Sequence, residues 1–103
     1  MQGRILQPRG RLDIATYTAF ERDVLAAIEA GSPWLVFDFS DLLHVSSVGV
    51  RVVMMAAKRL RAIGGRVAVC GMQTPIADVI EVSGLNPILE IYADRASALA
   101  ALP

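Results

Sequence analysis

Two adjacent serines at the start of a predicted helix are the residues of this chain best placed to do chemistry. Ser46 and Ser47 follow an apolar segment and open a long helical pattern beside Gly49. The first turn of a helix leaves backbone N–H groups unpaired and carries the positive end of the helix dipole, so it stabilises anions. A hydroxyl there either caps the helix or accepts a phosphate that the same N–H groups would hold. Both interpretations stay open for Ser47, and Ser46 is the second candidate for phosphorylation.

Other reactive side chains are few. His44 is the only histidine, so the sequence cannot build a site that needs two of them. Cys70 is the only cysteine and lies in an apolar stretch, which predicts a packed structural thiol. Asp38, Ser40 and Asp41 could form a small acidic site, although turn formation explains them better. We therefore expect a binding protein rather than an enzyme, with no metal and no cofactor.

The composition is that of one folded domain covering residues 1–103. Hydrophobic residues make up 54% of the chain, and ten basic and ten acidic side chains give a net charge of zero. This balance gives no general attraction to nucleic acid or to an anionic membrane. No apolar run approaches the ~20 residues of a membrane helix. Because the first ten residues do not resemble a secretion signal and a lone cysteine suits a reducing compartment, we expect a cytoplasmic protein.

Strands and helices are predicted to alternate along the chain. Pro8 and Gly10 interrupt the first strand candidate, and the segment between the second strand and the second helix is expected to be a short turn. Thr74 is expected to cap its helix, with Pro75 at the first helical position. The predicted strands cover 4–12, 34–39, 66–71 and 88–92, and the predicted helices cover 17–30, 47–63, 74–83 and a last segment capped by Asp94. This pattern predicts an α/β domain with a mixed, mostly parallel sheet of about four strands and about four helices.

The helix that begins at Ser47 has two predicted faces. At 3.6 residues per turn, its small and apolar side chains gather on a side that should pack on the sheet: Val53, Ala56, Ala57 and Leu60. Arg51 and Lys58 lie opposite, and together with Arg59 and Arg61 they are interpreted as a solvated helix face rather than a nucleic-acid site. Met54 and Met55 flank this polar line. They form either an adaptable protein-binding surface or part of the core.

Three segments, in this order and at this spacing, resemble the STAS family of bacterial anti-sigma factor antagonists. The first is Gly-Arg-Leu-Asp at 10–13, before the first helix. The second is Asp-Phe-Ser at 38–40 followed by Val-Ser-Ser-Val-Gly-Val-Arg at 45–51. The third is the strand at 65–71 followed by the helix at 74–83. Together they span nearly the whole chain.

The resemblance implies a partner-switching regulator. In such a system the unmodified antagonist binds an anti-sigma factor, which is an ATP-binding serine kinase, and thereby frees a sigma factor. The kinase then phosphorylates the antagonist at the start of this helix, and a serine phosphatase completes the cycle. A phosphate adds nearly two negative charges to the contact surface and so separates the pair. The expected partner-binding residues are Asp41, His44, Val48, Arg51, Met54, Met55 and Lys58.

The chain departs from the family at the acceptor position. Family members usually read Asp-Ser-Ser-Gly, with the acceptor serine directly before the glycine, and here Val48 stands at that position and Ser46 at that of the aspartate. This favours an alternative within the same family, a STAS subunit that docks on the ATPase of a lipid-trafficking ABC transporter without a phosphorylation cycle. His44 stands where the family often has an aromatic residue and is expected to be partly buried. A shortened first strand would leave a sheet edge for a partner or a homodimer.

Overall fold

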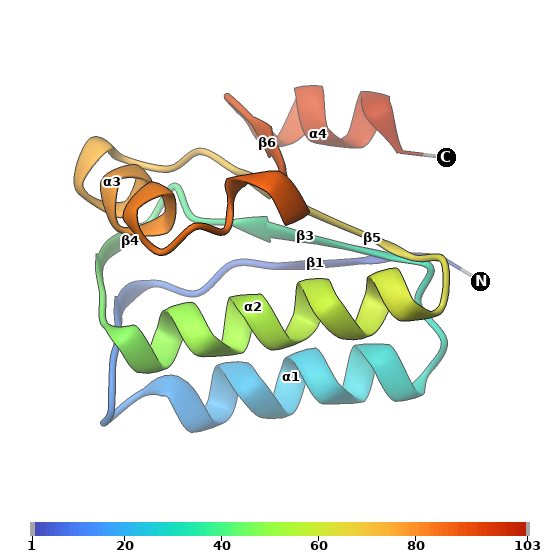
Figure 1. The fold of residues 1–103 in the computed structure, drawn as a ribbon, viewed down its shortest axis with the longest axis horizontal. Helices are drawn as coiled ribbons and strands as arrows, with labels where there is room; N and C mark the ends of the chain where they lie inside the picture. The colour runs from blue at the N-terminus through green and yellow to red at the C-terminus, as the bar shows by residue number, and fades with distance from the viewer. Residues whose placement is uncertain (1, 103) are drawn as a thin grey trace.

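Six strands and four α-helices alternate along residues 2–102, which are the residues that the computed structural model describes (Figure 1). The elements are β1 (Arg4–Leu6), β2 (Gly10–Leu12), α1 (Tyr17–Glu29), β3 (Trp34–Asp38), β4 (Leu42–Val45), α2 (Ser47–Ala62), β5 (Arg66–Cys70), α3 (Thr74–Val82), a short 3-10 turn (Asn86–Ile88), β6 (Glu90–Tyr92) and α4 (Arg95–Ala101).

The main sheet has four strands in the order β1-β3-β5-β6, and every pair in it is parallel. The central strands β3 and β5 are buried at all positions but the first, as expected for strands with helices on both faces. β2 and β4 form a separate two-stranded parallel sheet. The predicted α/β class and the four-strand sheet are therefore confirmed, and the main sheet is parallel throughout rather than mixed.

Three local predictions are corrected. The segment before α2 was expected to be a turn, but it contains the strand β4. The ends of β4, Leu42 and Val45, are buried and its two middle residues are exposed, so the strand lacks the usual alternation of apolar and polar residues. The single strand predicted over 4–12 divides into β1 and β2, because Pro8 has no N–H group to donate to a neighbour. Thr74 is the first helical residue of α3 rather than its cap, and Gln73 occupies the cap position.

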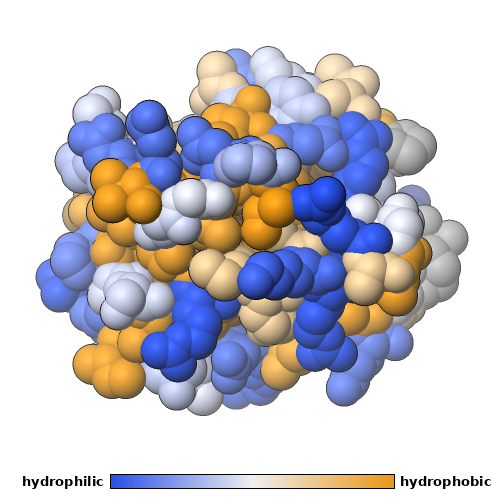
Figure 2. Space-filling view, in the orientation of Figure 1, coloured by the Kyte–Doolittle hydropathy of each residue, from blue (hydrophilic) through white to orange (hydrophobic). Residues whose placement is uncertain are grey.

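The helices cover the two faces of the main sheet unequally. α1 and α2 lie side by side on one face and α4 lies on the other (Figure 1). In the same view many hydrophilic side chains cover the outward sides of α1 and α2 (Figure 2). Between these helices and the sheet lies the main core, in which the ring centroids of Phe20 and Phe37 are 5.2 Å apart and those of Phe37 and Phe39 are 6.0 Å apart. The smaller core under α4 contains Val36 and Cys70.

Cys70 is fully buried, as predicted, and its thiol should make the protein less stable in alkali. Burial raises the pKa of Cys70 from 9.0 to about 11. Between these values the unfolded chain loses the thiol proton and the folded chain keeps it, so the free energy of unfolding falls as the pH rises. The slope contributed by one such group is at most about 1.4 kcal/mol per pH unit. Urea unfolding from pH 8 to pH 10 should give a flatter decline for Cys70→Ala than for the wild type, and parallel declines would contradict this assignment.

Candidate functional site

α2 begins beside the start of α1, at the carboxyl end of the central strands (Figure 1). Ser46 is its N-cap residue and has extended backbone angles. The Ser46 N–H donates to the carbonyl oxygen of Leu12 at 3.0 Å, and the Ser46 hydroxyl lies 3.5 Å from the same oxygen. Ser46 therefore ties the start of α2 to the end of β2. Of the two interpretations left open for Ser47, the helix cap is excluded, because Ser47 is the first residue of the helix and Ser46 is the N-cap.

The Ser47 side chain is exposed, and its hydroxyl has no hydrogen-bond partner among residues 2–102. The first N–H of α2 to bond the carbonyl four residues back is that of Val50, which donates to Ser46 at 3.0 Å. The first turn contains no acidic residue. An anion attached to Ser47 would thus lie next to unpaired backbone N–H groups and the positive end of a 16-residue helix. Val48, which follows, is half-buried.

Gly49 lets α2 start very close to the small sheet. A Cβ atom at position 49 would lie 2.8 Å from Val45 Cγ2 and 2.9 Å from both the Cγ atom and the carbonyl oxygen of Leu12. These distances are shorter than a normal carbon contact, and one of them is to the backbone. Glycine is therefore required by packing at this position, since it alone has no Cβ.

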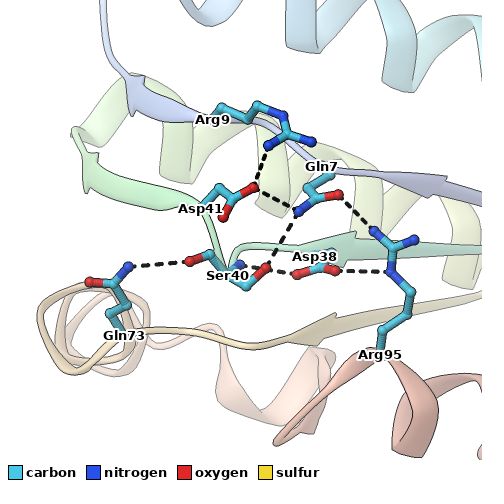
Figure 3. Close-up of polar contacts among 7 residues, drawn as sticks. All are labelled: Gln7, Arg9, Asp38, Ser40, Asp41, Gln73 and Arg95. Atoms are coloured by element: carbon cyan, nitrogen blue, oxygen red, sulfur yellow. Dashed lines mark hydrogen bonds and ion pairs between the residues drawn. The ribbon is translucent and has the colours of Figure 1, made fainter.

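The turn that leads into β4 is held by hydrogen bonds of its own aspartates (Figure 3). Asp38 Oδ1 accepts the Ser40 N–H at 3.0 Å, and Asp41 Oδ2 accepts Arg9 Nη1 at 2.6 Å. Gln73 Nε2 donates to the Ser40 carbonyl oxygen at 3.2 Å. The turn interpretation therefore holds for Asp38, whereas the Asp41 carboxylate binds Arg9 and Gln7 instead of the turn backbone. Among residues 2–102 no group of three or more His, Cys, Asp or Glu side chains could hold a metal ion.

Two residues that the sequence did not single out connect this turn to α4. Arg95, the first residue of α4, donates from Nε to Asp38 Oδ2 at 2.9 Å and from Nη2 to Gln7 Oε1 at 2.8 Å. Gln7 in turn donates to Asp41 Oδ2 at 3.0 Å. Figure 3 shows Gln7 between the arginine and the turn. A side chain 57 residues away from Asp38 thus helps to fix the segment that precedes the candidate site.

Loss of Arg95 is expected to destabilise the protein at neutral pH. Burial raises the pKa of Asp38, but the hydrogen bonds from Ser40 and the ion pair with Arg95 outweigh it, so the pKa lies below the ordinary 3.8. Because this pKa is lowered, the ionised carboxylate stabilises the fold above about pH 3.8 and the contribution is lost as the pH falls through the folded pKa. Arg95→Met should cost about 1–2 kcal/mol at pH 7, a value reduced for the partial exposure of the arginine.

Urea unfolding of the wild type and of Arg95→Met at pH 7 and pH 3 measures this effect. The difference between the two proteins should shrink at pH 3, below the ordinary pKa of 3.8, because the unfolded chain there takes up the proton that the folded Asp38 carboxylate resists. Arg9→Met is the matched control, because its ion pair to Asp41 is more exposed than that of Arg95 to Asp38: the two acidic side chains are 42% and 9% exposed, respectively. It should have little effect at either pH. An equal loss for Arg95→Met at both pH values would show that Arg95 acts through packing and its hydrogen bond to Gln7 instead of through the Asp38 carboxylate.

The predicted partner-binding residues are only partly gathered on one surface. Arg51 and Lys58 are exposed on α2, as predicted. Met54 and Met55 are half-buried and pack against the core, so they lie between the two alternatives of a protein-binding surface and a core position. His44 is exposed on β4, so the expectation of a partly buried ring was wrong. Asp41 is half-buried and engaged by Arg9.

Two exposed apolar side chains near the start of the helices were not predicted. Leu43 on β4 is 67% exposed, and Ile14, in the turn before α1, is 73% exposed. Single exposed apolar side chains are normal on protein surfaces, and Ile63 and Val82 are similarly exposed elsewhere on this one. A sequence signal existed for Leu43, because two adjacent leucines in a strand must point to opposite sides.

The fold and the site define a small parallel α/β domain that presents a helix start and a short neighbouring strand to solvent. The family model of the STAS domain matches residues 2–98. This chain belongs to the STAS domain family, as its sequence motifs predicted. No helix within residues 2–102 has the length and apolar character needed to span a bilayer.

Two related proteins are named as anti-sigma factor antagonists. The chain is 31% identical over 93 residues to BtrV of Bordetella bronchiseptica, named as an anti-sigma factor antagonist, with 90% of this chain and 80% of BtrV covered. It is also 31% identical over 68 residues to the anti-sigma F factor antagonist of Paenibacillus polymyxa, with 66% of this chain and 58% of that protein covered.

The fold is that of a solved anti-sigma factor antagonist. Unphosphorylated SpoIIAA matches with a TM-score of 0.85 and 21% identity, over 99% of this chain and 90% of that one. Phosphorylated SpoIIAA, described as a Bacillus cell fate determinant, matches with a TM-score of 0.78 and 20% identity, over 100% of this chain and 94% of that one. At these identities the likeness establishes the fold.

Proposed function

We propose that this protein is a cytoplasmic anti-sigma factor antagonist that binds an anti-sigma factor with serine kinase activity and is released from it by phosphorylation of Ser47. It acts by binding, without turnover of its own. The names of its relatives support the antagonist role. The observation that carries the rest is the exposed Ser47 hydroxyl, which has no partner among residues 2–102 and stands at the first position of α2.

Ser47 is favoured over its neighbours by their contacts. The Ser46 side chain is half-buried and its hydroxyl lies 3.5 Å from the Leu12 carbonyl oxygen, so phosphorylation of Ser46 would remove this contact and place a phosphate against a carbonyl oxygen. Val48 has no hydroxyl, although it stands at the usual acceptor position of the family. The acceptor function is therefore proposed to lie one residue earlier in this chain.

The proposed contact surface surrounds Ser47. It consists of Leu43 and His44 on β4 and the exposed side of α2 that carries Arg51 and Lys58. A phosphate on Ser47 would lie within this surface, where it must lose water and meet the partner, and this favours separation. In the free protein the start of α2 would stabilise the same phosphate.

A second function is favoured by one observation, the valine at position 48. A STAS subunit that docks on the ATPase of a lipid-trafficking ABC transporter needs no acceptor serine. The surface around β4 and α2 would then be a permanent contact, and Ser47 would remain unmodified.

Affinity purification of the tagged full-length protein from its own cells, followed by mass spectrometry, tests both functions. We expect an ATP-binding serine kinase among the partners, a serine phosphatase encoded with it, and phosphate on the peptide that contains Ser46 and Ser47. A transport ATPase together with an unmodified peptide would instead establish the second function. The purified partner must then bind the purified wild-type chain directly, and the Leu43→Asp variant, which places a charge on the apolar part of the surface, should bind at least about tenfold more weakly.

A further inference from the structure

The solvent side of α2 is positively charged and has no compensating acidic groups on the helix. Its 16 residues include four basic side chains and no acidic one. All four are exposed, and none takes part in any ion pair found among residues 2–102. Strongly hydrophilic side chains accordingly cross the middle of α2 in the space-filling view (Figure 2). The four residues are Arg51, Lys58, Arg59 and Arg61.

Three of these cations lie in line with the proposed acceptor serine. Positions 47, 51, 54, 58 and 61 alternate in steps of four and three residues, which places them on one side of an α-helix. This line joins Ser47 to Arg51, Lys58 and Arg61, with the half-buried Met54 between them. We call Arg51, Lys58 and Arg61 the basic stripe. Arg59 lies off this line, on another side of the helix.

Helix stability does not explain the basic stripe. The helix dipole favours cations in the last turn, which accounts for Arg59 and Arg61. Arg51 lies in the second turn, where the helix dipole does not stabilise a cation. Lys58 and Arg61 are three residues apart and carry like charges, which weakens a helix slightly. The dipole thus accounts for Arg61 alone among the three stripe residues, and a binding role would account for Arg51 and Lys58.

We propose that the basic stripe binds an acidic surface of a protein partner, and that a phosphate on Ser47 opposes this contact. The identity of that partner rests on the proposed function, in which it is the anti-sigma factor. A protein is favoured over nucleic acid because the net charge of the chain is zero and because the exposed Leu43 and His44 precede the same helix on β4. A phosphate on Ser47 would repel partner carboxylates and would also lie one turn from Arg51, close enough to compete for it.

A test without the partner uses an oligoglutamate peptide as a defined acidic surface. Amide resonances of the labelled full-length protein are followed by NMR during titration with this peptide, with an oligolysine peptide and with duplex DNA, at about 150 mM salt. We expect the oligoglutamate peptide to shift resonances of α2 and the oligolysine peptide to shift none of them. Equal shifts around arginines on other elements, or tighter binding of DNA than of the acidic peptide, would overturn the proposal.

Two variants of equal charge separate the stripe from a general charge effect. The stripe variant combines Arg51→Gln, Lys58→Gln and Arg61→Gln. The control variant removes the same charge from three exposed arginines outside the stripe, of which Arg59 lies on another side of α2: Arg4→Gln, Arg22→Gln and Arg59→Gln. The stripe variant should lose the α2 shifts and the control should keep them. Equal loss in the two variants would mean that net charge, not the stripe, attracts the acidic peptide.

The purified anti-sigma factor kinase then provides the second measurement. Its affinity for the stripe variant should be at least about tenfold lower than for the control, and the dependence of affinity on salt should be weaker. Unchanged affinity would overturn the stripe as the contact and leave the proposed function intact. Acidic-peptide binding without any kinase binding would overturn the proposed function and leave the preference of the stripe for acidic surfaces intact.

Discussion

Ser47→Ala is expected to abolish phosphate incorporation when the purified protein is incubated with its anti-sigma factor kinase and radiolabelled ATP. The reason is geometric, since among residues 2–102 the Ser47 hydroxyl is exposed and without a partner whereas the Ser46 hydroxyl faces Leu12. Ser46→Ala is the matched control. The Ser46 side chain makes no capping hydrogen bond to α2 and only a 3.5 Å contact with the Leu12 carbonyl oxygen, so its removal should cost less than about 1 kcal/mol of stability. The variant leaves the acceptor in place, so labelling should continue.

The same position should also control binding. Ser47→Ala, which cannot be modified, is expected to stay bound to the kinase in the presence of ATP, whereas the wild type dissociates. Ser47→Asp adds one negative charge to the contact surface and should weaken binding at least tenfold, an order-of-magnitude expectation for a charge in an interface. Undiminished labelling of Ser47→Ala would eliminate Ser47 as the acceptor. Labelling of Ser46→Ala reduced to background would transfer the role to Ser46.

Gly49→Val should have the largest effect on stability among single substitutions near the site. Its Cβ would meet Leu12 and Val45 at 2.8–2.9 Å, so the start of α2 must move away from β2 and β4. Overpacking of this kind costs about 1–3 kcal/mol, and the contact with a backbone oxygen places Gly49→Val at the upper end. Because Ser47 and the stripe move with the helix, we expect weaker kinase binding as well.

Thermal and urea unfolding measure this loss. Ala62→Val is the control, since it introduces the same side chain at an exposed position on the last turn of α2, where only helix propensity changes. It should cost less than about 1 kcal/mol. If both variants lost the same stability, close packing would not be the reason for glycine at position 49.

Much of the fold could be predicted because its local signals agree. Gly31, Gly64 and Gly84 all have positive φ angles just after a helix, where the sequence placed helix ends. The apolar runs of β3 and β5 indicated a sheet covered on both faces. β4 was missed because a four-residue strand with only its ends buried has no recognisable period.

The site could be located from the sequence but not assembled in detail. Two adjacent serines look equivalent in a sequence, and the Leu12 carbonyl oxygen, 34 residues away, decides which of them is held and which is free. The contact of Arg95 with Asp38 depends on where α4 docks, which no local pattern specifies. The partly buried environment expected for His44 came from the resemblance to a family that often has an aromatic residue there, whereas β4 presents its middle to solvent.

The second face of the main sheet is covered by a short helix, so the exposure of a buried thiol can report how often this face opens. α4 has seven residues and is the only helix over this face among residues 2–102, and a helix so short does not persist alone. We therefore expect α4 to detach from the sheet as one unit, and each detachment to expose Cys70 to solvent. The rate at which a thiol reagent labels Cys70 under native conditions would then report how often the C-terminal segment opens. Arg95, which binds the first turn of α4 to Asp38, would determine the rate of this opening.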